Sequence, residues 1–159
     1  MGLNIRFNGI PTDMARALQR GGPDAYGKTP ERAVSDGDGN PCRHCLEMIA
    51  KDEPMLVFAL RPFSGEQPYA ETGPAFLHAS ECRAHEGTDD LPPVLHDSPA
   101  YIVRGYGSDE RIAYGTGGVV DQRDISKRAA ELLGDENISF VDVRSASNNC
   151  WQARVTRDS

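Results

Sequence analysis

The sequence lacks the features that commit a protein to a membrane or to nucleic acid. It contains no run of about 18 apolar residues, the length that a transmembrane helix needs. Its 17 Lys and Arg residues form no block, and 24 Asp and Glu residues outnumber them, for a formal net charge of -7. An acidic chain has no long-range attraction for phosphate backbones or anionic lipids. We therefore expect no nucleic-acid or membrane partner, which leaves an unknown small molecule or protein.

The chain also begins without the hydrophobic core of a secretory signal, because polar residues interrupt the apolar positions of MGLNIRFNGI. We expect a cytoplasmic protein, in which four cysteines are more often free thiols or metal ligands than disulfides. A length of 159 residues with 38% hydrophobic and 26% charged residues is typical of a globular domain with a buried core. We predict a single domain over residues 1–159, with loops at about 21–40 and 83–99.

The hydrophobic pattern predicts an α+β fold with a mostly antiparallel sheet and two or more helices. Expected strands cover residues 3–7, 55–60, 75–78, 101–106, 111–115, 138–144 and 150–155, and expected helices cover 11–20 and the stretch after Asp121 or Asp124. Residues 101–115 are expected to form a hairpin around GSDE. The C-terminal half is therefore predicted as β-β-α-β-β.

The second predicted helix carries the clearest amphipathic pattern. Ile125, Ala129, Leu132 and Leu133 follow the i, i+4, i+7, i+8 spacing of one buried stripe. Gly134 follows directly, where a glycine in the left-handed conformation commonly ends a helix. We expect this helix to cover one face of the sheet.

Two pairs of ligand-type residues point to a metal. PCRHCL contains Cys42 and Cys45 at C-x-x-C spacing, and FLHASEC contains His78 and Cys82 at H-x-x-x-C spacing. Structural zinc sites take four thiolate or imidazole ligands, usually in two close pairs. A helix that starts after FLH would place His78 and Cys82 on one face. The pattern predicts one zinc site with these four ligands, in a treble-clef-like element in the middle of the chain.

The same residues have two other interpretations. Free cysteine is often buried as a small apolar residue, and a histidine at a strand end is often only a hydrogen-bonding group. Cys42 and Cys45 can also form a redox pair, although the flanking pattern is not that of a thioredoxin-like βαβ unit. The sequence leaves these alternatives open.

Other residues are candidates for ligand binding. Arg61, Tyr69 and Glu71 share a Pro/Gly-rich loop that either lines a small-molecule pocket or is only a solvated connection. Arg104 and Arg144 lie on predicted strands. They either form a cradle for a carboxylate or phosphate or pair with acidic neighbours such as Asp142 and Glu110. Cys150, preceded by Asn149, is either a nucleophile or an ordinary sheet residue on the more polar face.

Three segments taken together, PCRHCL, PYAETGPAFLH and VRSASNNCWQARV, resemble the bacterial Domain of Unknown Function 1203 family over about residues 3–157. The resemblance implies no activity. In the commoner family form, cysteines equivalent to Cys42 and Cys150 are present, but the second cysteine is usually missing and the strand near 75–78 ends in Val-Arg. The resemblance therefore implies that Cys45, His78 and Cys82 were added together within one branch. It also suggests a Cys42–Cys150 partnership, as thiols or a disulfide.

Three function classes remain, and no catalytic residue is assigned. A zinc-containing binding or interaction module is favoured, because the sequence contains no recognisable catalytic group of residues. The second class is a small-molecule enzyme that uses Cys150 with Arg104, Arg144 or Asn149. The third is a redox-responsive protein in which oxidation of Cys42 and Cys45 expels zinc.

Overall fold

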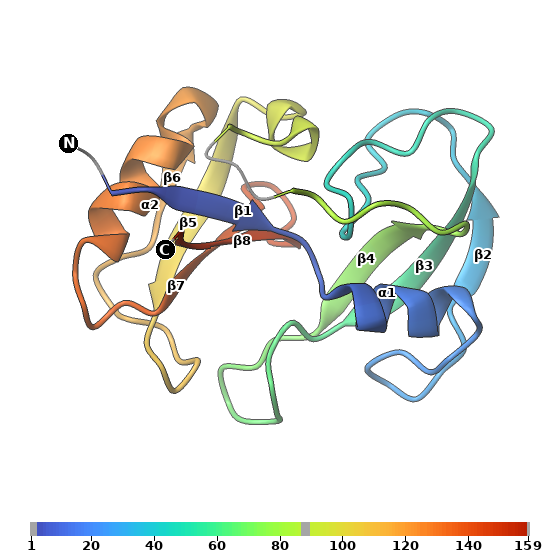
Figure 1. The fold of residues 1–159 in the computed structure, drawn as a ribbon, viewed down its shortest axis with the longest axis horizontal. Helices are drawn as coiled ribbons and strands as arrows, with labels where there is room; N and C mark the ends of the chain where they lie inside the picture. The colour runs from blue at the N-terminus through green and yellow to red at the C-terminus, as the bar shows by residue number, and fades with distance from the viewer. Residues whose placement is uncertain (1–2, 87–89, 159) are drawn as a thin grey trace.

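The computed structural model describes residues 3–86 and 90–158 and builds them around two antiparallel sheets (Figure 1). The strands are β1 (Ile5–Asn8), β2 (Glu31–Val34), β3 (Pro54–Leu60), β4 (Gly73–His78), β5 (Ala100–Tyr106), β6 (Gly118–Asp121), β7 (Phe140–Ser145) and β8 (Trp151–Arg157). The α-helices are α1 (Thr12–Gln19) and α2 (Ile125–Leu133), and the short 3-10 helices are η1 (Pro93–His96) and η2 (Gln122–Asp124). The predicted α+β class and the β-β-α-β-β order of the C-terminal half are confirmed.

The larger sheet has five strands in the order β1-β8-β7-β5-β6. Helix α2 lies against it, and Ile125, Ala129, Leu132 and Leu133 are buried in the same core as residues of β1, β5, β7 and β8. The predicted helical stripe is therefore confirmed. Gly134 is the C-cap with φ of -69°, so it ends the helix in a right-handed conformation and not in the expected left-handed one.

The smaller sheet has three strands in the order β2-β3-β4 (Figure 1). The apolar run of β3 is buried against Ala15 and Leu18 of α1, and Trp151 from the start of β8 belongs to the same core. Helix α1 is amphipathic, and Gly21 follows it with a φ of +91° that favours glycine. A second core therefore lies between the small sheet and α1, and it reaches the larger sheet through Trp151.

The chain path inserts the small sheet between the first two strands of the large one. Strand β1 pairs with β8, so that Ile5 lies opposite Arg157 and the two ends of the described chain are neighbours. The chain then runs through α1, β2, β3 and β4 before it returns to the large sheet at β5. Within residues 3–86 and 90–158, no helix has the length and apolar content that a bilayer crossing requires.

Two expected elements differ from the structure. Residues 31–34, which were expected to be part of a loop, form β2, an edge strand whose four residues are exposed. The chain turns at GSDE as expected, and residues 111–113 return beside the end of β5, where the Gly107 amide donates to the Arg111 carbonyl at 3.0 Å and the Ala113 amide to the Gly105 carbonyl at 2.9 Å. They form only an isolated bridge between Tyr106 and Ile112, however, and the strand that pairs with β5 is β6. Of the predicted loop at 83–99, residues 87–89 lie outside the described part.

Candidate metal centre

Cys42, Cys45, His78 and Cys82 come together at one point. One potential ligand atom of each residue lies within 4.8 Å of those of the other three. Cys42 and Cys45 lie between β2 and β3 and are buried, whereas His78, the last residue of β4, and Cys82, four positions later, are half-buried. The structure thus gathers the two pairs that the sequence singled out into one Cys/His cluster that can hold a metal.

The turn around Cys42 and Cys45, which we call the knuckle (residues 41–48), is fixed by backbone hydrogen bonds. The Leu46 amide donates to the Cys42 carbonyl at 3.1 Å, and the Cys42 amide donates to the Glu47 carbonyl at 3.0 Å. Leu46 has a φ of +59°, a left-handed conformation that costs energy for a residue with a side chain. Its side chain is fully buried, so packing in the larger core holds this conformation.

Close backbone approaches fix the position of the knuckle in the fold. The Arg43 amide donates to the Phe76 carbonyl of β4 at 3.0 Å, and the Ile10 amide donates to the Arg43 carbonyl at 2.8 Å. A Cβ atom at Gly9 would overlap the carbonyl oxygens of Arg43 and His44. Glycine is therefore required sterically where the segment between β1 and α1 crosses the knuckle.

The second ligand pair is placed by α1 and not by a helix of its own. The expected helix after FLH is absent, because residues 79–86 form bends and irregular structure. The Gln19 amide nitrogen donates to the carbonyls of His78 and Ser80, both at 2.9 Å, and Arg16 Nη2 donates to the Cys82 carbonyl at 2.7 Å. Side chains of α1 thus satisfy carbonyls that a helix would have paired internally. The knuckle, strands and ligand pair follow in treble-clef order, without the helix that ends such an element.

Two distances within the cluster match those around a tetrahedral ion. Bonds of about 2.3 Å to sulfur and about 2.05 Å to nitrogen place two sulfurs about 3.8 Å apart and a sulfur and a nitrogen about 3.6 Å apart. Cys42 Sγ lies 3.9 Å from Cys82 Sγ, and Cys45 Sγ lies 3.5 Å from His78 Nδ1. Nδ1 is therefore the imidazole nitrogen that faces the thiols. His78 Nε2 faces outward and lies 3.9 Å from a carboxylate oxygen of Glu53.

His44 supports the cluster from outside. It is 1% exposed, its Nδ1 lies 3.1 Å from Cys82 Sγ, and its Nε2 lies 2.9 Å from the Thr12 hydroxyl. If Nδ1 carries the proton, it donates to the sulfur while Nε2 accepts from Thr12, so each ring nitrogen has a partner. Such outer groups orient metal ligands and tune their basicity. This role of His44 could not be inferred from the sequence, since it depends on α1 lying beside the knuckle.

The electrostatics of the four groups favour negative charge on sulfur. Hydrogen bonds from Cys42 and Cys45 hold the pKa of the Cys82 thiol well below its usual value. Hydrogen bonding to Cys42 and Cys82 raises the pKa of Cys45 and raises the pKa of His78 to about 10. These directions favour negative charge on Cys82 and protons on Cys45 and His78. A cation that enters this cluster displaces those protons.

Arg43 brings a positive charge beside the cluster. It is 3% exposed, and burial lowers the pKa of its guanidinium to about 10, against the opposing effect of Cys150 and Cys42. Its Nε donates to the Trp151 carbonyl at 2.7 Å, and its Nη1 donates to the Pro41 carbonyl at 3.0 Å. Three thiolates around a divalent ion carry one net negative charge, which this guanidinium is placed to offset.

The family comparison agrees with the resemblance seen in the sequence. A family model described as "Protein of unknown function (DUF1203)" matches residues 39–157 of the chain. The chain belongs to the DUF1203 family. The matched region contains the whole Cys/His cluster but not β1 or α1, the segments that hold the cluster from the outside. Comparison with curated proteins and with solved structures gives no significant match.

A second group of polar residues in this DUF1203 protein gathers around Arg104 and Arg144, which lie on the adjacent interior strands β5 and β7 of the larger sheet. Arg104 Nη2 lies 2.9 Å from Glu71 Oε1, and Arg144 Nη1 lies 3.4 Å from Glu71 Oε2. The Asn149 side chain donates to the same Glu71 oxygen at 3.3 Å. The two arginines thus form the cradle considered above, and it holds the chain's own Glu71. Glu110 accepts from Ser64 instead, and Asp142 pairs with Arg154.

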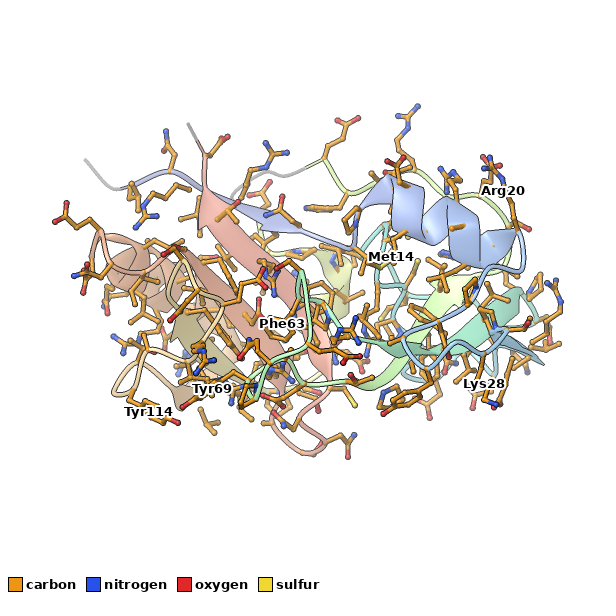
Figure 2. The ribbon with its side chains drawn as sticks, turned by 90° about the horizontal axis from the view of Figure 1, so that it is seen from below. Met14, Arg20, Lys28, Phe63, Tyr69 and Tyr114 are labelled. Carbon is orange, nitrogen blue, oxygen red and sulfur yellow. The ribbon has the colours of Figure 1, made fainter. Side chains whose placement is uncertain are left out.

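Cys150 borders this group and remains a free thiol. All four cysteines are free, so the Cys42–Cys150 disulfide suggested by the family form is not present. Cys150 is half-buried, and its sulfur lies 3.8 Å from the Asn148 carbonyl. Arg61 and Tyr69 have other partners. Arg61 pairs with Glu66 at 3.4 Å, and the Tyr69 hydroxyl lies 2.9 Å from that of Tyr114 on the neighbouring loop (Figure 2).

Proposed function

We propose that this DUF1203 protein is a binding module whose fold is stabilised by one structural zinc ion on Cys42, Cys45, His78 and Cys82. The observation that carries the proposal is the agreement of the sulfur–sulfur and sulfur–nitrogen distances, 3.9 and 3.5 Å, with the edges of a zinc tetrahedron. Thiolate and imidazole ligands favour zinc over the hard cations that prefer oxygen. Four protein ligands leave no position for a reacting water, so the ion is structural.

The ion would act as a cross-link between distant segments. It would join the knuckle to the end of β4 and to the irregular segment that α1 holds in place. Without the ion, the four side chains are joined only by weak thiol hydrogen bonds, beside the backbone hydrogen bond from Arg43 to Phe76 and the hydrogen bonds from α1. Free, partly buried thiols are kept reduced in the bacterial cytoplasm, where we place the protein. We further propose that its partner is a small molecule or another protein.

Elemental analysis of the purified protein tests the zinc proposal directly. The expected result is one zinc per chain in the wild-type protein and loss of zinc in Cys82→Ser, because three ligands hold a structural ion much less tightly than four. Cys150→Ser is the matched control, since it removes a thiol outside the cluster, and it should keep one zinc per chain. A wild-type protein without zinc under reducing conditions, or a Cys82→Ser variant that keeps its full content, contradicts the proposal.

A further inference from the structure

The three thiols of the Cys/His cluster differ in their distance from the surface. Cys42 and Cys45 are 0% and 6% exposed and belong to the core between the small sheet and α1. Cys82 is half-buried at the margin of that core, and Glu81 and Arg83 on either side of it are exposed. A small oxidant in solution therefore meets Cys82 first.

A second thiol lies close to Cys82. The Sγ atoms of Cys42 and Cys82 are 3.9 Å apart, whereas a disulfide holds its two sulfurs about 2.05 Å apart. Closing this gap requires a small movement of Cys82. Residues 79–86 form neither helix nor strand, and side chains of α1 hold their carbonyls. The segment can therefore shift without opening a helix or a sheet ladder.

Cys45 is placed less well to react with an oxidised Cys82. Its Sγ faces His78 Nδ1 at 3.5 Å. A bond from Cys45 to Cys42 would lie within the knuckle, whose turn is fixed by backbone hydrogen bonds at Cys42 and by the left-handed Leu46. Such a bond would close a loop of only a few residues and would tie the knuckle to nothing else. A bond between Cys42 and Cys82 would join the same two segments as the ion.

We propose that Cys82 is an oxidation site for hydroperoxides and that Cys42 converts the oxidised sulfur to a disulfide, which replaces the metal as the link between the knuckle and the end of β4. The release of the ion rests on the proposed zinc site. Once Cys42 and Cys82 are bonded, only Cys45 and His78 remain as ligands, and two ligands do not hold a structural zinc. The fold keeps a cross-link over the same 40 positions.

Hydrogen peroxide supplies the oxidising equivalents for both steps. The Cys82 sulfur attacks one peroxide oxygen, so that an S–O bond forms, the O–O bond breaks and hydroxide leaves with the electron pair. The Cys42 sulfur then attacks the Cys82 sulfur, the S–S bond forms, and the S–O bond breaks to release a second hydroxide. Two protons, from the thiols or from solvent, convert the hydroxides to water. The two sulfurs together lose the two electrons that the peroxide gains.

Peptide mapping of the wild-type protein after treatment with hydrogen peroxide tests the pairing. Trypsin cleaves after Arg43, between the two cysteines of the knuckle, so the three thiols of the cluster fall in separate peptides. We expect the Cys42 peptide to be linked to the Cys82 peptide. A Cys42–Cys45 link as the main product, or Cys82 oxidised to the sulfinic acid without a disulfide, overturns the proposal.

Zinc measured on the same samples separates this inference from the zinc proposal. A chromogenic chelator should record about one ion released per disulfide formed, and dithiothreitol should restore zinc binding. A protein that contains no zinc before oxidation contradicts the zinc proposal, while the peptides still decide the pairing. A protein that contains zinc but forms no Cys42–Cys82 disulfide leaves the zinc proposal intact and shows the oxidation site to be wrong.

Two variants and a melting experiment complete the test. Cys45→Ser keeps both cysteines of the proposed disulfide and should still form it; loss of the link would mean that Cys45 is the reacting partner, contrary to the proposal. Cys150→Ser, which removes a half-buried thiol outside the cluster, should form the link as the wild type does. The oxidised, zinc-free wild type should melt above the reduced protein in chelator, because its disulfide closes the same loop as the ion. Equal melting temperatures would contradict the exchange of cross-links.

Discussion

Replacement of Cys82 by serine should lower the free energy of unfolding only when metal is bound. The ion would link Cys42 to Cys82 across 40 positions of the sequence. A cross-link that closes a loop of this length stabilises a fold by about 4 kcal/mol through the entropy of the unfolded chain. For a chain of 159 residues, this corresponds to a fall in melting temperature of about 8–16 °C.

The assay is thermal unfolding followed by circular dichroism, in zinc-buffered solution and with a strong chelator. In zinc, the wild-type protein should melt well above Cys82→Ser, and Cys150→Ser should melt with the wild type. In chelator, the free energies of unfolding of the three proteins should agree to within about 1 kcal/mol, because Cys82 is half-buried and a serine hydroxyl can also hydrogen-bond to His44. If Cys82→Ser loses the same stability with and without zinc, the thiol acts by packing alone and the cross-link reasoning is refuted.

Three further substitutions test the surroundings. Gly9→Ala should cost about 1–3 kcal/mol in urea unfolding, because its Cβ overlaps the knuckle backbone, while Gly65→Ala, which meets no atom within 4 Å, should be neutral. His44→Leu should weaken zinc affinity about 10–100-fold in competition with a chromogenic chelator, because it removes the imidazole that faces the Cys82 sulfur. A variant with the wild-type zinc affinity would contradict this supporting role of His44. Arg154→Met should lower the free energy of unfolding by about 3–5 kcal/mol, because it leaves the fully buried carboxylate of Asp142 unpaired. Asp142→Asn should lower it by less in the same urea unfolding assay, and an equal loss in the two variants would contradict this reasoning.

Elements with a strong local pattern were predictable from the sequence. The stripe of α2 and the apolar run of β3 follow from side-chain periodicity, which depends only on nearby residues. Strand β2 was missed because all four of its residues are exposed, so no alternation marks it. It forms through main-chain pairing with β3, from Glu31 opposite Val57 to Val34 opposite Pro54. Pairing of this kind is not encoded in the strand's own composition.

Long-range pairing was the second limit. Nothing in β1 identifies β8 as its partner, and the division of the strands into two sheets follows from pairings such as this one. The four-residue GSDE turn was a reasonable local choice for the hairpin. The turn forms, with the Glu110 amide donating to the Gly107 carbonyl at 2.9 Å, but the strand that pairs with β5 begins only at Gly118. The short-range pattern does not contain this pairing.

The candidate metal site was more predictable than the fold around it. Each ligand pair is close in the sequence, so the spacing alone limits where the side chains can lie. The helical reason given for His78 and Cys82 was wrong, however, because Arg16 and Gln19 hold that segment in an irregular form. Groups that act from a distance in the sequence, such as these two side chains, could not be inferred from spacing.

Arg43 provides a physical connection between the Cys/His cluster and a cavity of about 180 Å³ that Arg144, Cys150 and Trp151 line. It stands between the two cysteines of the knuckle, and its guanidinium donates to the carbonyl of Trp151, whose side chain lines the cavity. A buried guanidinium must keep its partners, so a shift of the knuckle either moves the start of β8 or leaves a charged donor unpaired. The second outcome is costly, and the first is therefore favoured. An ion bound to the knuckle would therefore also hold one wall of the cavity in place.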